Sequence, residues 1–177
     1  MEQYKRYFTR QKEYKLTTTT NSLWPFYQGW DNYQQHLLQA IRPLTDEQLN
    51  LRVAPQQRTV HEITAHIVGA RAGWFHLHLG EGDATMEDLS HWDDEDAPIR
   101  STKELLHGLE ATWAMIEDCL KRWNPASLND NYIRTRDGEH RPITRQWIIW
   151  HVLEHDLNHG GELFLTLGTH GHWVPDL

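Results

Sequence analysis

The sequence predicts an all-α protein built as a four-helix bundle. Four segments repeat apolar residues with the period of about 3.6 that marks an amphipathic helix, and capping-box pairs stand at the start of two of them. No stretch of useful length alternates in the manner of a half-buried strand. Helices that each carry one apolar stripe bury it most simply against one another. The chain of 177 residues fits a single domain covering residues 1–177.

The first predicted helix covers residues 24–41, and Pro25 falls in its opening turn, where a proline is tolerated. Its apolar stripe consists of Trp30, Tyr33, Leu37, Leu38 and Ile41. In the segment that follows, Thr45 and Gln48 have capping-box spacing. We therefore expect a short capped turn before the second long helix.

The second predicted helix covers residues 60–79. Thr59 and Glu62 form a capping-box pair at its start, and Gly80 is expected to end it. Its apolar positions are Ile63, Ile67, Ala70, Trp74 and Leu77. Residues 81–100 are acidic, and their carboxylates repel one another while glycine and proline interrupt regular structure. We expect this stretch to be a solvated loop.

The third predicted helix starts at the capping-box pair Ser101 and Glu104 and continues to about residue 123. Its stripe consists of Leu105, Leu109, Trp113, Ile116 and Leu120. The connection over residues 124–142 is expected to be irregular. It contains the turn dipeptide Asp137-Gly138, which closes either a small hairpin or a simple loop.

Charge and composition exclude several classes of function. The formal net charge is -8 and no predicted helix carries a Lys/Arg cluster, so we expect a small-molecule partner rather than nucleic acid or an anionic membrane. The longest mainly apolar stretch, residues 147–153, falls short of the ~20 residues of a membrane-spanning helix. The N-terminal sequence MEQYKRYFTR has no apolar signal region. The single cysteine, Cys119, is expected in the core and fits a reducing, cytoplasmic setting.

The last predicted helix, residues 144–167 with Gly168 as its end, carries His151, His155 and His159 at successive i, i+4 positions. Each is advanced by about 40° around the helix relative to the one before. Two such imidazoles can share one ion at the ~2.0–2.1 Å of a zinc–nitrogen bond, whereas three would have to bend over about 80° of arc. We expect two of the three to bind one divalent metal ion.

A third ligand has to come from a facing helix, and His66 is the best candidate. It lies in the middle of the second predicted helix, near the small residues Gly69, Ala70 and Gly73, which allow close approach or leave a cavity. The alternative is that these histidines merely hydrogen-bond or cap neighbouring polar groups. Arg71 and Trp74 could line the mouth of the site, although Trp74 also suits the core.

The segment RTVHEITAHIVGARAGWF, followed about ninety residues later by HVLEHDLNHGGEL, resembles the DinB/YfiT-like superfamily of bacterial proteins over roughly residues 24–167. The resemblance implies an up-down-down-up four-helix bundle, frequent homodimers, and one zinc, nickel or similar ion held by His66, His155 and His159, with His151 outside the triad. One departure concerns Gly160, which replaces a basic residue usual in the family's tail motif.

Three histidine ligands leave a coordination position open for a reactant. The resemblance implies a thiol-dependent S-transferase that uses a low-molecular-weight thiol of the bacillithiol or mycothiol type as cosubstrate. Two alternatives stay open, namely a metal-dependent hydrolase acting through a metal-bound water and a non-catalytic metal-binding stress-response protein. Glu162, two turns after His155, is the candidate for orienting a ligand or acting as a base, and it could equally be a surface carboxylate.

Overall fold

The computed structural model describes residues 21–136 and 138–176, and the sequence MEQYKRYFTR discussed above lies outside them. The described part of the chain is mainly helical and contains one small β-hairpin. Its helices and strands are α1 (Gln28–Ile41), α2 (Val60–Ala72), η4 (Gly73–His78), α3 (Thr85–Ser90), α4 (Thr102–Arg122), β1 (Asn131–Arg136), β2 (Glu139–Thr144) and α5 (Arg145–Thr169). Short 3-10 turns cover Trp24–Phe26, Gln48–Asn50 and Pro125–Asn129. Among the described residues, no helix has the length and apolar character needed to cross a membrane.

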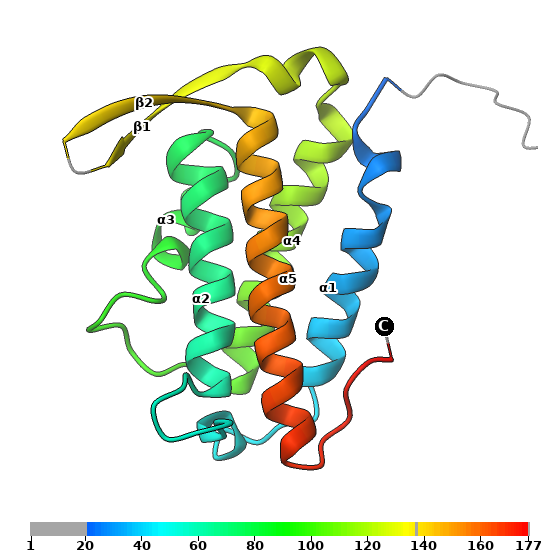
Figure 1. Cartoon of the computed structure of the whole chain (residues 1–177), viewed down its shortest axis with the longest axis vertical. Helices are drawn as coiled ribbons and strands as arrows, with labels where there is room; N and C mark the ends of the chain where they lie inside the picture. Colours follow the sequence, from blue (N-terminus) through cyan, green and yellow to red (C-terminus); the bar gives the residue numbers. More distant parts are fainter. Residues whose placement is uncertain (1–20, 137, 177) are drawn as a thin grey trace, which may run out of the picture.

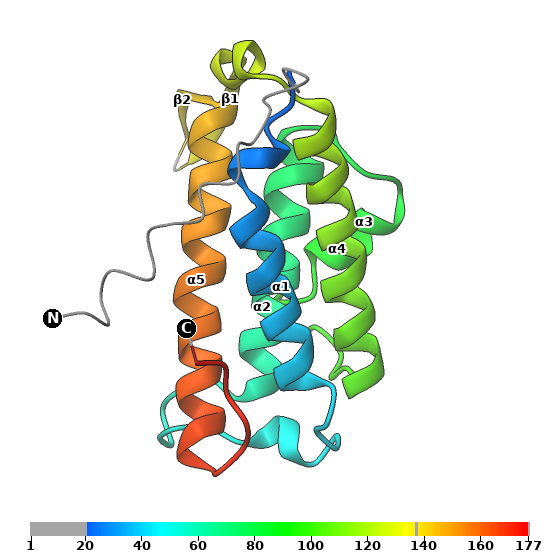
Figure 2. The same cartoon turned by 90° about the vertical axis from the view of Figure 1, so that its right-hand side faces the viewer.

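Four long helices, α1, α2, α4 and α5, lie side by side with their axes roughly parallel (Figures 1 and 2). The sequence colours run one way along α1 and α5 and the opposite way along α2 and α4. Each of α1 and α2 contacts both α4 and α5. Their apolar stripes meet in a common core, in which Leu37, Ile67, Leu109 and Ile148, one from each helix, are wholly buried.

The predicted starts of α2 and α4 are confirmed by their hydrogen bonds. The Thr59 hydroxyl accepts from the Glu62 backbone N–H, and the Glu62 carboxylate accepts in return from the Thr59 N–H. Ser101 and Glu104 exchange the same two bonds at the start of α4. These reciprocal bonds satisfy N–H groups that have no partner within the helix, which is why the spacing predicts the boundary so closely.

Two helix boundaries differ from the prediction. Pro25 lies in a 3-10 turn, and α1 begins only at Gln28. At the other end of the chain, α5 continues through Gly168 to Thr169, and Gly171, with a φ of 75°, takes the left-handed conformation that follows the helix. A glycine is compatible with a helix interior at a modest cost, so it is the positive φ that marks the end.

The second predicted helix is confirmed as helical over residues 60–78, but its geometry changes on the way. It is an α-helix to Ala72 and a π-helix over Gly73–His78, after which Gly80 adopts a φ of 71°. The wider π turn is common near functional sites because it re-aims the side chains that it carries.

The prediction of a solvated loop over residues 81–100 is wrong in part, because α3 forms within it. Met86, Leu89 and Trp92 turn inward and are 5%, 5% and 6% exposed. The burial of these three apolar side chains outweighs repulsion among the carboxylates, most of which stay in solvent. Two of the acidic residues, Glu87 and Asp88, lie in the first turn of α3, where the helix dipole favours negative charge.

The all-α class needs a correction as well, because residues 124–142 include most of a two-stranded antiparallel sheet. The strands β1 and β2 pair from Asn131 opposite Thr144 to Arg136 opposite Glu139. Of the two alternatives for the turn dipeptide, the hairpin is the correct one, and Gly138 has a φ of 78°. The strands escaped prediction because β2 is largely exposed and lacks apolar alternation. The hairpin lies across the ends of α2 and α5 and extends beyond them (Figure 1).

Candidate metal centre

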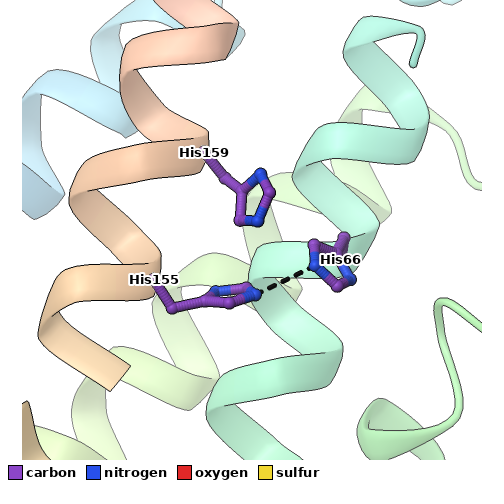
Figure 3. A group of neighbouring side chains, drawn as sticks. All are labelled: His66, His155 and His159. Carbon is purple, nitrogen blue, oxygen red and sulfur yellow. Dashed lines mark hydrogen bonds between the residues drawn. The ribbon is translucent and has the colours of Figure 1, made fainter. Parts of the chain in front are cut away.

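His66 on α2 and His155 and His159 on α5 come together, each partly exposed, between the two helices (Figure 3). One ring nitrogen of each lies within 4.8 Å of one ring nitrogen of each of the others. The ring centroids are 4.4 Å apart for His155 and His159 and 4.6 Å apart for His66 and either partner. The three residues selected from the sequence therefore share one place, and no member points away.

Asp93 orients His66. Its Oδ2 lies 2.7 Å from His66 Nδ1, and it follows α3 in the segment predicted to be a solvated loop. A carboxylate accepts only, so Nδ1 carries the proton and Nε2 keeps its lone pair for a ligand. That Nε2 atom lies 2.9 Å from His155 Nε2 (Figure 3).

Glu162 has the same relation to His159. Its Oε2 lies 2.9 Å from His159 Nδ1, three residues earlier on α5. The structure thus places the Glu162 carboxylate where it can orient a histidine of the cluster, and whether it also orients a bound molecule or acts as a base stays a hypothesis. The hydrogen bond directs the Nε2 lone pair of His159 away from the carboxylate, as in carboxylate–histidine–metal arrangements.

His155, the innermost of the three, is held in its neutral form. Burial, followed by the neighbouring His66 and His159, lowers the pKa of His155 to about 3. Its Nδ1 is buried and finds no hydrogen-bond partner among the described residues. A metal ligand has to be a neutral imidazole, so this environment keeps His155 ready to bind without losing a proton first.

The carboxyl of Asp93 remains charged beside its histidine. Burial alone would raise its pKa, but the hydrogen bond and charge interaction with His66 outweigh that effect and leave the pKa of Asp93 below its usual value. The negative charge of Asp93 beside Nδ1 raises the basicity of the His66 imidazole, so that its Nε2 would bind a metal ion more strongly.

The donor set fits a divalent transition-metal ion. Bonds of about 2.0–2.1 Å to one tetrahedral ion place ligand nitrogens roughly 3.3 Å apart. The three nitrogens lie within 4.8 Å of one another, so small rotations of the side chains would bring them to that spacing. Two ring orientations are already set by carboxylates, and the third ring has an orphaned Nδ1. The cluster could hold one such ion.

A cavity of about 620 Å³ opens from the cluster toward the hairpin. Besides the three histidines and Asp93, its wall includes Trp74, Leu77, His78, Arg134, Thr135 and His151. Trp74, which also suited the core, is in fact a half-buried wall residue. A metal ion at the histidines would thus face an open space large enough for a small molecule.

His151 is in the cavity wall and outside the cluster. Its ring stacks on Trp147 with centroids 4.9 Å apart and touches the edge of Trp74. The centroid of His151 is 6.4 Å from that of His155, compared with 4.4 Å between His155 and His159. The two indoles hold the His151 ring away from the other three.

Arg71 does not line the mouth of the site, contrary to the sequence hypothesis. It is wholly buried on the other side of α2, where its Nη2 lies 2.7 Å from Asp156 Oδ2. The i, i+5 spacing from His66 turns Arg71 away from the histidine side of the helix.

Sequence reasoning missed Asp93 and the hairpin residues of the wall. Gly69, one turn after His66, is the residue that could have indicated the approach of Asp93. From the sequence alone, its small size indicates only close approach of another segment or a cavity. A Cβ at that position would collide with the Asp93 carboxylate. Gly69 thus lets the acidic segment approach α2 closely enough to reach His66.

The helical fold and the histidine cluster together define a DinB-like protein. The chain is similar in structure to a DinB-like protein from Bacillus cereus ATCC 10987, with a TM-score of 0.67, 22% identity, and coverage of 89% of this chain and 99% of that one. This likeness establishes the fold. The sequence profile of mycothiol-S-transferases matches residues 29–165, so the chain belongs to the mycothiol-S-transferase family. No curated protein matches the sequence. The predicted resemblance to the DinB/YfiT-like superfamily is thereby confirmed.

Proposed function

We propose that this protein is a metal-dependent thiol S-transferase in which His66, His155 and His159 hold one divalent ion. The observation that carries the proposal is the convergence of three ligand nitrogens within 4.8 Å of one another at the wall of an open cavity. Membership of the mycothiol-S-transferase family points the chemistry toward a thiol.

A divalent ion bound there would acidify a thiol placed beside it and so supply a thiolate nucleophile near neutral pH. The chain itself contributes orientation. Asp93 and Glu162 hold two of the rings, and the neutral His155 has one ring nitrogen without a proton with which to complete the set. Trp74 and Leu77 form an apolar part of the wall against which the electrophile can pack. In the transfer, a carbon–sulfur bond forms, the leaving group departs with its electron pair, and the thiol proton goes to solvent.

Several finer features belong to the same proposal. The ion is zinc or nickel, the cosubstrate is a thiol of the bacillithiol or mycothiol type, and the chain works as a homodimer in the cytoplasm. We further propose that residues 1–177 form one domain with an up-down-down-up four-helix bundle. The opposite directions of the helix pairs in Figures 1 and 2 support that topology.

The ligand set is tested by metal analysis of untagged protein carrying His66→Ala, His155→Ala or His159→Ala. Each variant should lose most of its bound metal, since two imidazoles hold an ion far less tightly than three. His151→Ala is the matched control because it changes the same helix and the same cavity wall, and it should retain the metal. A full metal equivalent in all three triad variants would rule out the site.

The reaction is tested with monochlorobimane as electrophile, since transfer releases chloride and forms a fluorescent thioether. Metal-loaded protein should accelerate this reaction with bacillithiol or mycothiol, and the triad variants should not. Metal-loaded protein that accelerates transfer with neither thiol would contradict the proposal. If the protein is inactive with both thiols and also unfolds when its metal is removed, the ion has a structural role instead.

A further inference from the structure

Arg134 brings a positive charge to the cavity from outside the helical bundle. It lies on β1, and its side chain and that of the next residue, Thr135, form part of the cavity wall. The guanidinium carbon lies 5.1 Å from the ring centroid of Trp74 and 5.7 Å from that of Trp147. Two indoles, one from η4 and one from α5, therefore hold this cation at the wall.

Among the described residues, no carboxylate pairs with the guanidinium of Arg134. Within residues 21–136 and 138–176, Arg134 makes no hydrogen bond or ion pair with another side chain, while Asp93, the described carboxylate of the cavity wall, is engaged by His66. Arg134 is also the one Lys or Arg among the described residues of that wall. Burial lowers the pKa of the neighbouring His78, and Arg134 adds to that effect.

The position of Arg134 relative to the histidines selects the kind of ligand. Close contacts run from Arg134 to Trp74 and from Trp74 to His151, and the His151 ring lies 6.4 Å from that of His155 on the same cavity wall. A molecule whose sulfur sits at the histidine cluster can thus extend along this wall to the guanidinium. The planar fork of N–H donors on arginine pairs with a carboxylate through two parallel hydrogen bonds.

We propose that Arg134 binds a carboxylate of the thiol cosubstrate and so makes the protein selective for carboxylate-bearing thiols. A single guanidinium, with no second Lys or Arg among the described wall residues, balances the one charge of a carboxylate better than the two of a phosphate. The inference rests on the proposed function, because it assumes that sulfur binds at the histidine cluster.

The hairpin supplies a matched control. Arg141 is the direct cross-strand partner of Arg134, yet it does not belong to the cavity wall. Its side chain is 75% exposed and pairs with Glu139 through a 2.6 Å contact. Arg134→Gln and Arg141→Gln therefore remove the same charge from neighbouring positions of the same sheet, and only the first should affect the ligand.

The test measures binding of two series of thiols to zinc-loaded protein by calorimetry. One series consists of ω-mercaptoalkanoic acids of increasing length, and the other of ω-mercaptoalkanols of the same lengths. At the length that spans the wall, the acid should bind at least about ten-fold more tightly than the alcohol, in line with a charge-assisted hydrogen-bonded pair. Arg134→Gln should reduce this preference to about two-fold or less without weakening the alcohol, and Arg141→Gln should preserve it.

A second variant, Arg134→Lys, keeps the charge and loses the planar fork, so its preference should fall between those of the wild type and Arg134→Gln. Equal binding of acids and alcohols at every length would overturn the inference and leave the S-transferase proposal standing. Persistence of the acid preference in Arg134→Gln would overturn it too. Failure of every thiol of both series to bind the zinc-loaded wild type would instead contradict the proposed function, and the inference with it.

Discussion

Asp93 and Glu162 stand behind the two outer histidines of the cluster. Each carboxylate accepts a hydrogen bond from the Nδ1–H of its histidine, at 2.7 Å for His66 and 2.9 Å for His159. The Nε2 atom of each ring is then the one that can bind a metal ion. Such carboxylates set the tautomer of the imidazole and raise its basicity. Their effect should be visible in metal affinity.

Asp93→Asn should weaken metal binding by about 10–100-fold, because the amide no longer enforces the tautomer that frees Nε2. The measurement is a competition titration against a chromophoric chelator. Asp94→Asn is the control, since Asp94 is the next residue, is exposed and bonds through its carboxylate to the exposed His91. Equal affinities for the two variants would contradict the assignment of Asp93.

Glu162→Gln separates the two roles considered for that carboxylate. As a positioning residue, Glu162 should affect metal affinity by about ten-fold or more, while activity per bound metal stays within about two-fold at saturating metal. A general base would instead show a loss of about 100-fold or more in activity per bound metal. Glu154→Gln, an exposed change on the same helix, serves as the control and should leave both quantities unchanged.

The helix α5 carries two histidines of the cluster together with the close packing that holds them. Gly160 lies directly after His159 and faces α1, where a Cβ would collide with the hydroxyl and ring of Tyr33. Burial, with Asp156 contributing, raises the pKa of Tyr33 to about 12, so its hydroxyl stays protonated and donates to the Leu157 carbonyl. A side chain larger than that of glycine has no room at position 160 because Tyr33 fills that space.

The adjacent glycines of α5 should respond in opposite ways to alanine. Gly160→Ala should lower the free energy of unfolding by about 1–3 kcal/mol, since the buried Tyr33 ring cannot move freely. A Cβ at Gly161 meets nothing within 4 Å, so Gly161→Ala should raise that free energy by roughly 0.5–1 kcal/mol through helix propensity. Urea denaturation measures both. Changes of the same sign in the two variants would show that the contact with Tyr33 does not decide stability.

Across the whole molecule, one buried polar network connects the four long helices. Arg71 of α2 bonds to Asp156 of α5 and to Gln34 of α1, and Gln34 in turn donates to the Leu109 carbonyl of α4. Trp30 of α1 donates to Asp156 at 2.6 Å. Because Arg71 and Asp156 are both 0% exposed, each depends on the other for compensation of its charge.

Arg71→Met should lower the free energy of unfolding by about 3–5 kcal/mol, because it leaves the Asp156 charge buried without a cation. Arg71→Met combined with Asp156→Asn should lose less than the single variant, since the uncompensated charge is gone. Arg42→Met breaks an exposed ion pair with Glu110 between α1 and α4 and should cost less than about 1 kcal/mol. Similar losses for Arg71→Met and Arg42→Met in urea denaturation would refute this account.

Local sequence was sufficient to predict the four long helices, the capped starts of α2 and α4, and a histidine pair on α5. Capping boxes such as Thr59 with Glu62 satisfy backbone groups within one turn, so their spacing alone predicts where α2 begins. The i, i+4 spacing predicted a pair on α5 from local geometry, and the family motif selected His155 and His159 from three candidates.

Tertiary packing determined which side chains from outside α2 and α5 contribute to the site. Asp93 and Arg134 come from an acidic segment and a hairpin that carry no periodic pattern pointing to the cavity. Their places depend on how α3 and the hairpin dock against the helices, and thus on apolar contacts distant in sequence from the side chains they position. Local hydrogen bonds set the geometry of a helix, so the sequence alone predicts which of its side chains lie one turn apart. The side chains that a loop contacts are determined only when the core has formed and the loop has docked against it.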